Sequence, residues 1–266
     1  MARYLNGATI MTTPTPRSLA LAREAGFDGI EARAERLLDD PDELRATRAA
    51  SRPGEVWSLN GVRISLRPNG SLDRDQLLAD LAPRLDACRT IGAHALLAVP
   101  PRAPGLSEEK ARSGVREGLE VVREHAAALG VRVAFEFLGF FDCPIPTPAA
   151  AGRTVDGLPG IELVLDSCHW HASGAGSLDE FPVERLAMVH LNDAPSKSPS
   201  RLEDADRLLP GLGVINLPAL IAALRNRSYD GPWSLETFNP DYWDEDPSDV
   251  VRRGAAALNA VLAAGA

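Results

Sequence analysis

Four side chains with metal-binding chemistry each close an apolar run in the second half of the sequence. They are Glu136, Asp166, His190 and Glu236. The apolar runs have the length of buried strands and are bounded by turn-forming residues. Three carboxylates and one imidazole form a donor set that suits Mn²⁺, Mg²⁺, Co²⁺ or Zn²⁺. We therefore predict that one divalent metal ion binds at these four side chains.

The spacing of these four residues indicates how they are brought together. They are separated by 30, 24 and 46 residues, and the first two intervals are each one strand–helix unit long. A polar loop predicted over residues 192–213 accounts for the longer third interval. In a parallel barrel the carboxyl ends of all strands face the same mouth. Four consecutive strands would then present one ligand each to a single point.

The whole chain alternates between strand-like and helix-like segments. Strands are predicted over residues 3–10, 27–31, 55–62, 93–99, 131–136, 161–166, 186–191 and 233–236. Helices are predicted over residues 15–25, 42–51, 72–91, 107–129, 147–156, 179–185, 217–226 and 247–263. Eight such units predict an α/β fold with a single (β/α)₈ TIM-barrel domain over residues 1–266. A doubly wound open sheet is the alternative, but the chain has no glycine-rich phosphate loop after its first strand.

Composition excludes several classes of partner. The 266 residues are 45% hydrophobic and carry a formal net charge of −9, which argues against nucleic acid as a partner. The arginine-dense stretch 17–52 is interleaved with acids and is typical of solvated helix faces. No apolar run approaches the ~20 residues of a membrane helix, and the N-terminus shows no signal-peptide pattern. Three cysteines without a CxxC pair do not form a disulfide framework, so we expect a cytoplasmic protein.

Four motifs together resemble a known family. They are Asp166-Ser-Cys-His169, His190-Leu-Asn-Asp193, Arg207-Leu-Leu-Pro-Gly-Leu-Gly213 and Ser234-Leu-Glu236-Thr-Phe-Asn-Pro-Asp-Tyr-Trp243. This pattern is similar to the xylose-isomerase-like sugar isomerase and epimerase superfamily, and within it to the inosose (2-keto-myo-inositol) isomerases. The resemblance covers residues 131–251 well, whereas the first half matches only in its alternation of strands and helices.

The resemblance implies a role for each matching residue. Glu136 and Glu236 correspond to the two glutamates that bind metal and act as the catalytic acid and base. Asp166 and His190 correspond to the remaining metal ligands. His169 and Arg207 correspond to substrate-binding residues, and the longer loop of this sequence makes Arg201 and Lys197 alternatives to Arg207.

Further residues near the strand ends are candidates for supporting roles. Asp193 follows His190 by three residues and is expected to support it, Glu31 ends an early strand, and Trp243 is a candidate for the pocket wall. Other aromatic residues follow the same strands and could cover the pocket. They are Phe140, Phe141, Trp170, Phe238 and Tyr242.

The expected activity is metal-dependent isomerisation or epimerisation of a non-phosphorylated keto-sugar or keto-inositol, as in carbohydrate metabolism and inositol catabolism. A bound cation would acidify the proton between a carbonyl and a hydroxyl carbon, and one glutamate would remove it to give a cis-enediolate. A lyase of the same fold, such as a 3-dehydroshikimate or inosose dehydratase, is the alternative, and a non-catalytic polyol-binding barrel is a remote one. A DNA-repair endonuclease with three zinc ions would need more than the five histidines present. Homo-oligomers are common in the resembling family.

Overall fold

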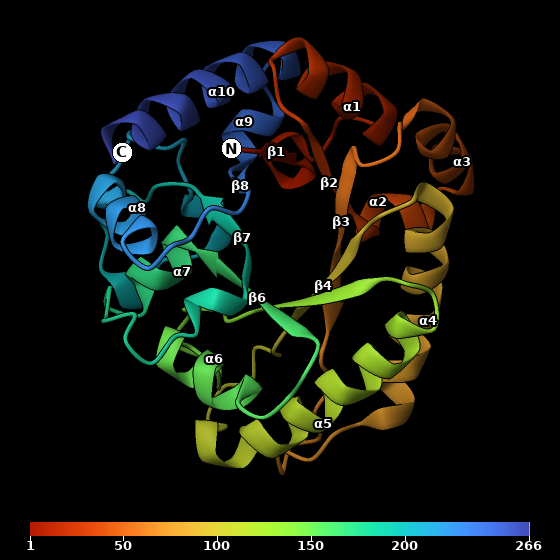
Figure 1. The fold of residues 1–266 in the computed structure, drawn as a ribbon, viewed down its shortest axis with the longest axis vertical. Helices are drawn as coiled ribbons and strands as arrows, with labels where there is room; N and C mark the ends of the chain where they lie inside the picture. The colour runs from red at the N-terminus through yellow and green to blue at the C-terminus, as the bar shows by residue number, and fades with distance from the viewer. Residues whose placement is uncertain (266) are drawn as a thin grey trace.

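Eight parallel strands close into a barrel in which each strand pairs with its neighbours in chain order (Figure 1). The computed structural model describes residues 1–265, so the last residue of the domain predicted for 1–266 lies outside the described residues. The strands are β1 (Arg3–Asn6), β2 (Gly29–Arg33), β3 (Val56–Arg63), β4 (Ala95–Val99), β5 (Arg132–Glu136), β6 (Ile161–Asp166), β7 (Leu186–Leu191) and β8 (Trp233–Leu235). The prediction of a (β/α)₈ barrel is confirmed.

Helices form the ring outside the barrel (Figure 1). They are α1 (Thr15–Glu24), α2 (Ala34–Asp39), α3 (Pro41–Ala50), α4 (Arg74–Ile91), α5 (Glu108–Ala127), α6 (Pro148–Val155), α7 (Ser167–Ala172), α8 (Leu217–Arg225), α9 (Pro240–Trp243) and α10 (Pro247–Ala264). Local sequence sets the ends of α4. The Asp73 side chain accepts a hydrogen bond from the Gln76 backbone, and Gly92 ends the helix with φ 72°, a conformation that favours glycine.

One predicted strand is wrong in extent, and one short helix was not predicted. The strand predicted over residues 3–10 ends at Asn6, whose side chain caps a 3₁₀ turn, Gly7–Ile10, by accepting a hydrogen bond from Ala8. Both the strand and the turn bury apolar residues, so hydrophobicity alone could not separate them. The short helix α2 after β2 was also absent from the prediction.

The helix predicted over residues 179–185 is also wrong. Only a 3₁₀ turn, Val183–Arg185, forms there, because Pro182 cannot donate a backbone hydrogen bond within a helix. The helix that follows β6 is instead α7, which begins directly after Asp166 and contains His169. The short helix α9 after β8 was likewise not predicted.

Side-chain alternation along the strands explains why the polar residues at their ends face the barrel interior. Ala134, Val164 and Met188 pack together in an interior apolar cluster. Each lies two residues before Glu136, Asp166 or His190, and residues two apart on a strand share a face. An apolar layer therefore lies beneath a polar layer at the carboxyl ends of the strands.

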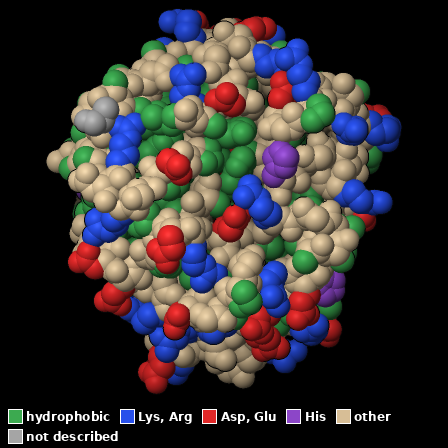
Figure 2. All heavy atoms as spheres, in the orientation of Figure 1, with side chains coloured by type: hydrophobic (Ala, Val, Ile, Leu, Met, Phe, Trp, Pro, Cys, Tyr) green, Lys and Arg blue, Asp and Glu red, His purple; other side chains and the backbone are tan. Residues whose placement is uncertain are grey.

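The exposed charges are mixed in sign. On the face shown in Figure 2, basic and acidic side chains are interspersed rather than gathered by sign. In the arginine-dense stretch, Arg17 pairs with Glu24 on the solvated face of α1, as interpreted. Arg33 and Glu43 of the same stretch are buried, so the interpretation is wrong for them. Among residues 1–265, no helix combines the length and apolar character that a membrane crossing requires.

Candidate metal centre

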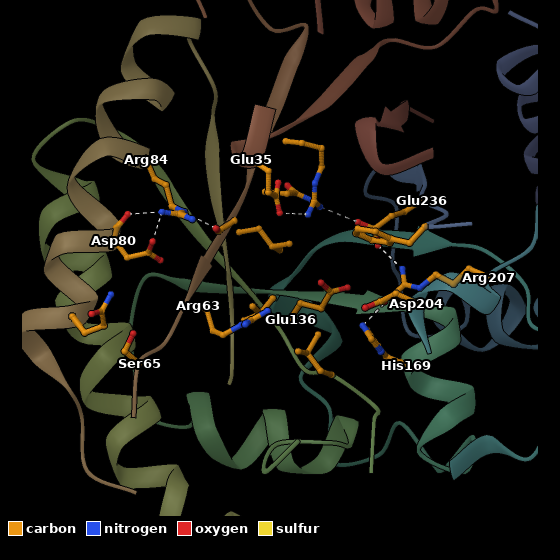
Figure 3. Close-up of a pocket in the computed structure, with 18 residues that line it drawn as sticks. Glu35, Arg63, Ser65, Asp80, Arg84, Glu136, His169, Asp204, Arg207 and Glu236 are labelled. Atoms are coloured by element: carbon orange, nitrogen blue, oxygen red, sulfur yellow. Dashed lines mark hydrogen bonds and ion pairs between the residues drawn. The ribbon is translucent and has the colours of Figure 1, made fainter. Parts of the chain in front are cut away.

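One cavity opens at the carboxyl ends of the strands (Figure 3). Its volume is about 530 Å³, which is in the range of small-molecule sites. Six of the charged or polar side chains that line it come from the ends of strands or from the segments that follow them. They are Arg33, Arg63, Glu136, His169, Arg207 and Glu236. The cavity therefore joins the ends of β2 and β3 to the residues singled out on the later strands.

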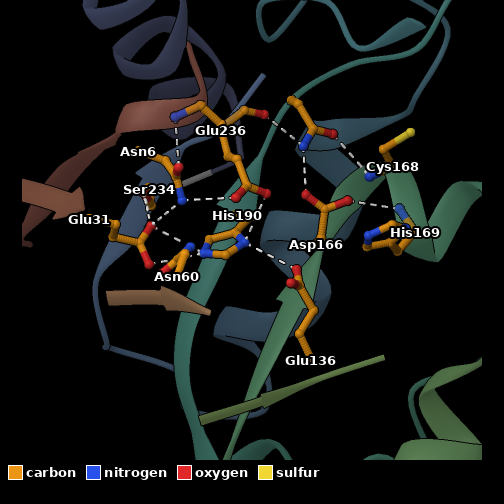
Figure 4. A network of polar contacts seen from close by, with 12 residues as sticks. Asn6, Glu31, Asn60, Glu136, Asp166, Cys168, His169, His190, Ser234 and Glu236 are labelled. Atoms are coloured by element: carbon orange, nitrogen blue, oxygen red, sulfur yellow. Dashed lines mark hydrogen bonds and ion pairs between the residues drawn. The ribbon is translucent and has the colours of Figure 1, made fainter. Parts of the chain in front are cut away.

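The four predicted metal ligands lie together (Figure 4), and two of them, Glu136 and Glu236, line this cavity. Each offers one ligand atom, and these atoms all lie within 4.8 Å of one another. All four side chains are buried. Strands β5, β6 and β7 place the first three residues, and Glu236 directly follows β8. The chain thus gathers the set through strand order, as the spacing predicts.

His190 stands at the centre of the cluster. Its Nδ1 lies 3.1 Å from Oε1 of Glu136 and 3.1 Å from Oε2 of Glu236. Its other ring nitrogen, Nε2, faces away from them and lies 3.1 Å from Oε1 of Glu31. Nδ1 is therefore the nitrogen that points toward the other candidate ligands, while Nε2 is held from β2.

Glu31 belongs to the support of the cluster rather than to the cavity wall. Its carboxylate is completely buried and accepts hydrogen bonds from Oγ of Ser58, at 2.8 Å, and from Nδ2 of Asn6, at 3.2 Å. With the hydroxyl of Ser234 and the ring of His190, these contacts fix the carboxylate on several sides. A carboxylate behind a histidine sets the tautomer and orientation of the ring.

Asp166 and Glu236 are each held by an asparagine. Nδ2 of Asn192 donates to Oδ2 of Asp166 at 2.6 Å, and Nδ2 of Asn6 donates to Oε1 of Glu236 at 2.8 Å. The other oxygen of Asp166 accepts the His169 backbone N–H at 2.8 Å and so caps α7. The same carboxylate therefore begins the helix and faces the cluster.

Arg207 and His169 meet beside the carboxylates. Arg207 is buried, and its Nη1 lies 2.7 Å from Oε2 of Glu236 and 3.1 Å from Oδ2 of Asp166. Its Nη2 lies 3.0 Å from Nε2 of His169. Since a guanidinium only donates, Nε2 of His169 accepts and the ring proton resides on Nδ1. Arg201 and Lys197, the alternatives to Arg207 for substrate binding, do not line the cavity: Arg201 is exposed, and Lys197 pairs with Asp206.

Burial and charge separate the protonation states of the cluster. Burial raises the pKa of Glu136 to about 7, and His190 only partly offsets this. Burial also disfavours charge on Glu236, but His190 and Arg207 hold its pKa well below the ordinary value. The pKa of His190 lies well above its usual range because the surrounding carboxylates outweigh its burial. Burial, together with Arg207, keeps the pKa of His169 well below its usual range.

The donor set fits a divalent cation. Four buried carboxylates face two guanidinium groups, of Arg33 and Arg207, and the imidazole of His190, so the ionised cluster has an excess of negative charge. The carboxylates are those of Glu31, Glu136, Asp166 and Glu236. A buried group of this kind is stable only when its charge is balanced. A divalent ion at the convergence of the four candidate ligands would supply that balance.

Two of the other predicted residues have different surroundings from those expected. The Asp193 carboxylate accepts the backbone N–H groups of Ala194, Gly211 and Ile215, so it fixes the loop after β7 rather than His190. Trp243 donates its indole N–H to the Ala8 carbonyl at 2.8 Å and packs α9 against the 3₁₀ turn.

The aromatic candidates divide in the same way. Phe238 lines the cavity and makes cation–π contacts with Arg33 and Arg207, whose guanidinium carbons lie 4.9 and 5.2 Å from its ring centre. Phe140 contacts His169 edge-to-face, with ring centres 4.7 Å apart. Phe141 is exposed.

Several residues of the site were not predicted from the sequence. They are Asn6, Arg33, Asn192 and Asp204. Asn6 follows an apolar run, as the ligands do, but an amide at a strand end is not a distinctive signal. Arg33 ends β2 within the arginine-dense stretch that was interpreted as solvated surface. Its position two residues after Glu31, on the same strand face, is the signal that could have found it.

Comparisons with known proteins agree with this architecture. Residues 19–261 match the sequence model of the xylose isomerase-like TIM barrel family. The chain belongs to this family. An inosose isomerase of Halalkalibacterium halodurans is 29% identical over 94% of this chain and 92% of its own length. The crystal structure of IolI protein with a binding zinc atom superposes with a TM-score of 0.88 at 24% identity, covering 99% of this chain and 98% of that one.

A lyase is also among the relatives of this xylose isomerase-like barrel. A 3-dehydroshikimate dehydratase of Pseudomonas putida is 26% identical over 88% of this chain, which spans 38% of that protein. The barrel is thus similar in sequence both to proteins named as isomerases and to one named as a dehydratase.

Proposed function

We propose that the protein is a divalent-metal-dependent isomerase or epimerase of a non-phosphorylated keto-sugar or keto-inositol. The observation that carries this proposal is the convergence of Glu136 and Glu236 with Asp166 and His190, beside a cavity that the two glutamates line. The similarity to inosose isomerases supports the reaction class, and the zinc in the IolI structure supports the metal.

Glu136, Asp166, His190 and Glu236 would hold the metal ion. When bound, such an ion polarises a substrate carbonyl and the neighbouring hydroxyl, and this acidifies the carbon-bound proton between them. The remaining chemistry belongs to side chains of this chain.

The two glutamates are suited to opposite halves of a proton transfer. Glu236 is held ionised by Arg207, whereas the pKa of Glu136 is raised to about 7 by burial. Carboxylates with separated pKa values mark a base and an acid. Glu236 removes the proton to give a cis-enediolate, and return of a proton to the neighbouring carbon completes isomerisation. Return to the original carbon from the opposite face, by Glu136, is epimerisation.

Arg207 and His169 are placed to hold the substrate oxygens during this transfer. Both line the cavity beside Glu236, and each has a buried nitrogen without a protein partner, Nε of Arg207 and Nδ1 of His169. Donors fixed before the reaction stabilise an oxyanion as its charge develops.

A dehydratase is the second candidate, and the similarity to the Pseudomonas putida protein favours it. It would share the first proton abstraction and then expel a β-hydroxyl group as water. The ligand set serves either reaction, so the product has to decide between them.

Turnover in deuterated water tests the proposal. Protein stripped with a chelator and reloaded separately with Mn²⁺, Co²⁺, Zn²⁺ or Mg²⁺ is incubated with inososes, ketohexoses and 3-dehydroshikimate. Proton NMR is expected to show an isomeric or epimeric ketone with deuterium at the reacting carbon. An ultraviolet-absorbing enone or aromatic product would replace the isomerase by the lyase, and absence of exchange with every ketone would refute both.

The cellular compartment is part of the proposal. All three cysteines, Cys88, Cys143 and Cys168, are free and buried. Free thiols without disulfides are usual in a reducing compartment. This supports the proposal that the enzyme works in the cytoplasm.

A further inference from the structure

The wall of the cavity formed by β2 and β3 has a surplus of hydrogen-bond donors. Three of the four arginines that line the cavity have carboxylate partners. Arg33 pairs with Glu35 and Glu236, Arg84 with Asp80, and Arg207 with Asp166, Asp204 and Glu236. The fourth, Arg63, has no carboxylate within ion-pair distance in residues 1–265.

Arg63 is free to reach a ligand. It is the last residue of β3, its side chain is exposed, and it extends into the cavity on the side of Glu136 (Figure 3). Arg84, by contrast, is committed to the protein, because it also donates to the backbone carbonyls of Gly61 and Asp80 at 2.7 Å each. Within residues 1–265, the one arginine of this cavity without a carboxylate partner therefore belongs to β3.

One buried donor in the same wall is also without a partner. Among residues 1–265, Nε of Arg33 is buried and makes no hydrogen bond. Arg33 is the register partner of Asn60 on β3, the strand that ends at Arg63. Unsatisfied buried donors are rare in folded proteins and call for an acceptor. The wall is thus suited to an oxygen-rich, negatively charged group.

We infer that the substrate carries a carboxylate, and that Arg63, at the β2–β3 wall, binds it while the ketone end lies at the metal centre. The fork of a guanidinium matches the two oxygens of a carboxylate. A phosphate fits less well, because it carries nearly two charges and Glu35 and Asp80 also line this cavity. The inference rests on the proposed function for the position of the ketone, and it narrows the substrate to a polyhydroxylated keto acid or a carboxylated cyclic ketone.

Binding of two unreactive polyols tests the anion site independently of turnover. D-gluconate and D-glucitol differ in one carboxylate, and their dissociation constants are measured by calorimetry with the protein as purified. We expect gluconate to bind ~10- to 100-fold more tightly, the range of a charge-assisted pair. Arg63→Met should abolish this preference and leave glucitol binding within about twofold, while Arg63→Lys should keep part of it.

A matched control and a second assay separate the possible failures. Arg67→Met removes an exposed arginine of the loop after β3 that does not line this cavity, and it should leave the preference intact. Equal binding of the two polyols would overturn the inference, because the protein would then not recognise the carboxylate. A preference for gluconate that remains in Arg63→Met would also overturn it, because another residue would then bind the carboxylate.

Turnover of a ketohexose and of the matching hexulosonate completes the test. In wild type the kcat/KM should favour the hexulosonate by ~10- to 100-fold, and Arg63→Met should remove that preference without slowing the neutral ketose. If the wild-type protein turns over neither substrate, the proposed isomerase function is contradicted. The binding constants of the two polyols would still decide whether Arg63 binds a carboxylate.

Discussion

Strands β5 to β8 carry the four candidate metal ligands at their carboxyl ends, whereas β1 and β2 present side chains that hold two of those ligands in place. Asn6 of β1 contacts Glu236, and Glu31 of β2 contacts His190. The first half of the barrel therefore lacks ligands but is not a passive wall. The two halves are coupled through hydrogen bonds across the barrel interior, and each half can be disturbed separately.

The largest expected effect comes from the glutamates of the ligand half. Glu136→Gln and Glu236→Gln keep the shape of the side chain but remove its ability to carry a proton. We expect kcat to fall by ~10²- to 10⁴-fold in each variant, the usual contribution of a general acid or base. Deuterium exchange into the substrate, followed by NMR, measures the loss. Full activity in Glu136→Gln would refute its catalytic assignment.

A smaller effect is expected from the supporting half. In Glu31→Gln the Nε2–H of His190 loses a charged acceptor, so the ring is less basic and less well oriented. We expect the affinity for Zn²⁺ to fall by ~10- to 100-fold, as for other residues behind a metal-binding histidine. Competition with a coloured chelator measures it. Glu24→Gln on the exposed face of α1 is the control, and equal zinc affinity in the two variants would show that β2 does not support the site.

This contrast also explains what could be predicted from the sequence. The ligands of β5 to β8 stand out because each ends an apolar run and the runs are one strand–helix unit apart. Asn6 and Glu236 are 230 residues apart, and nothing local in the sequence connects them. Helix α7 was not predicted for a related reason. Asp166 is both a candidate ligand and the N-cap of this helix, and an aspartate at a strand end is compatible with either role.

Metal binding should depend on pH in a defined direction. In the metal-free protein the carboxylates outweigh burial and raise the pKa of His190 well above its usual value, and burial raises that of Glu136 to about 7. A ligand nitrogen must be deprotonated, so binding expels the proton from Nδ1 of His190. Affinity should therefore rise by about tenfold or more per pH unit from pH 6 to 7.

Calorimetry in buffers of different ionisation enthalpy counts the released protons. Glu31→Gln should release fewer than wild type, because removing one of the carboxylates around His190 makes its proton easier to lose before the metal arrives. Equal proton release in both proteins would mean that the supporting half does not tune the ligand half.

The smallest effect on activity is expected from an ion pair outside the cavity, which tests whether coupling in the first half is specific to the site. Glu43 on α3 accepts hydrogen bonds from Arg36 and from the backbone and hydroxyl of Thr15. Burial alone would raise the pKa of Glu43, but these donors lower it below the ordinary value. Glu43→Gln should reduce the free energy of unfolding at pH 7 by about 1–3 kcal/mol and leave kcat unchanged.

The pH dependence of that loss follows from the lowered pKa of Glu43. Its stabilisation is complete above the pKa of the unfolded chain, near 4.5, and disappears as pH falls through the lower pKa of the folded protein. Urea unfolding of wild type and Glu43→Gln should therefore show a wide gap at pH 7 that narrows in acid. A gap that is constant with pH would assign the loss to packing. A fall in zinc affinity like that of Glu31→Gln would mean that any damage to the first half reaches the metal centre, and the separation of ligand and supporting halves would fail.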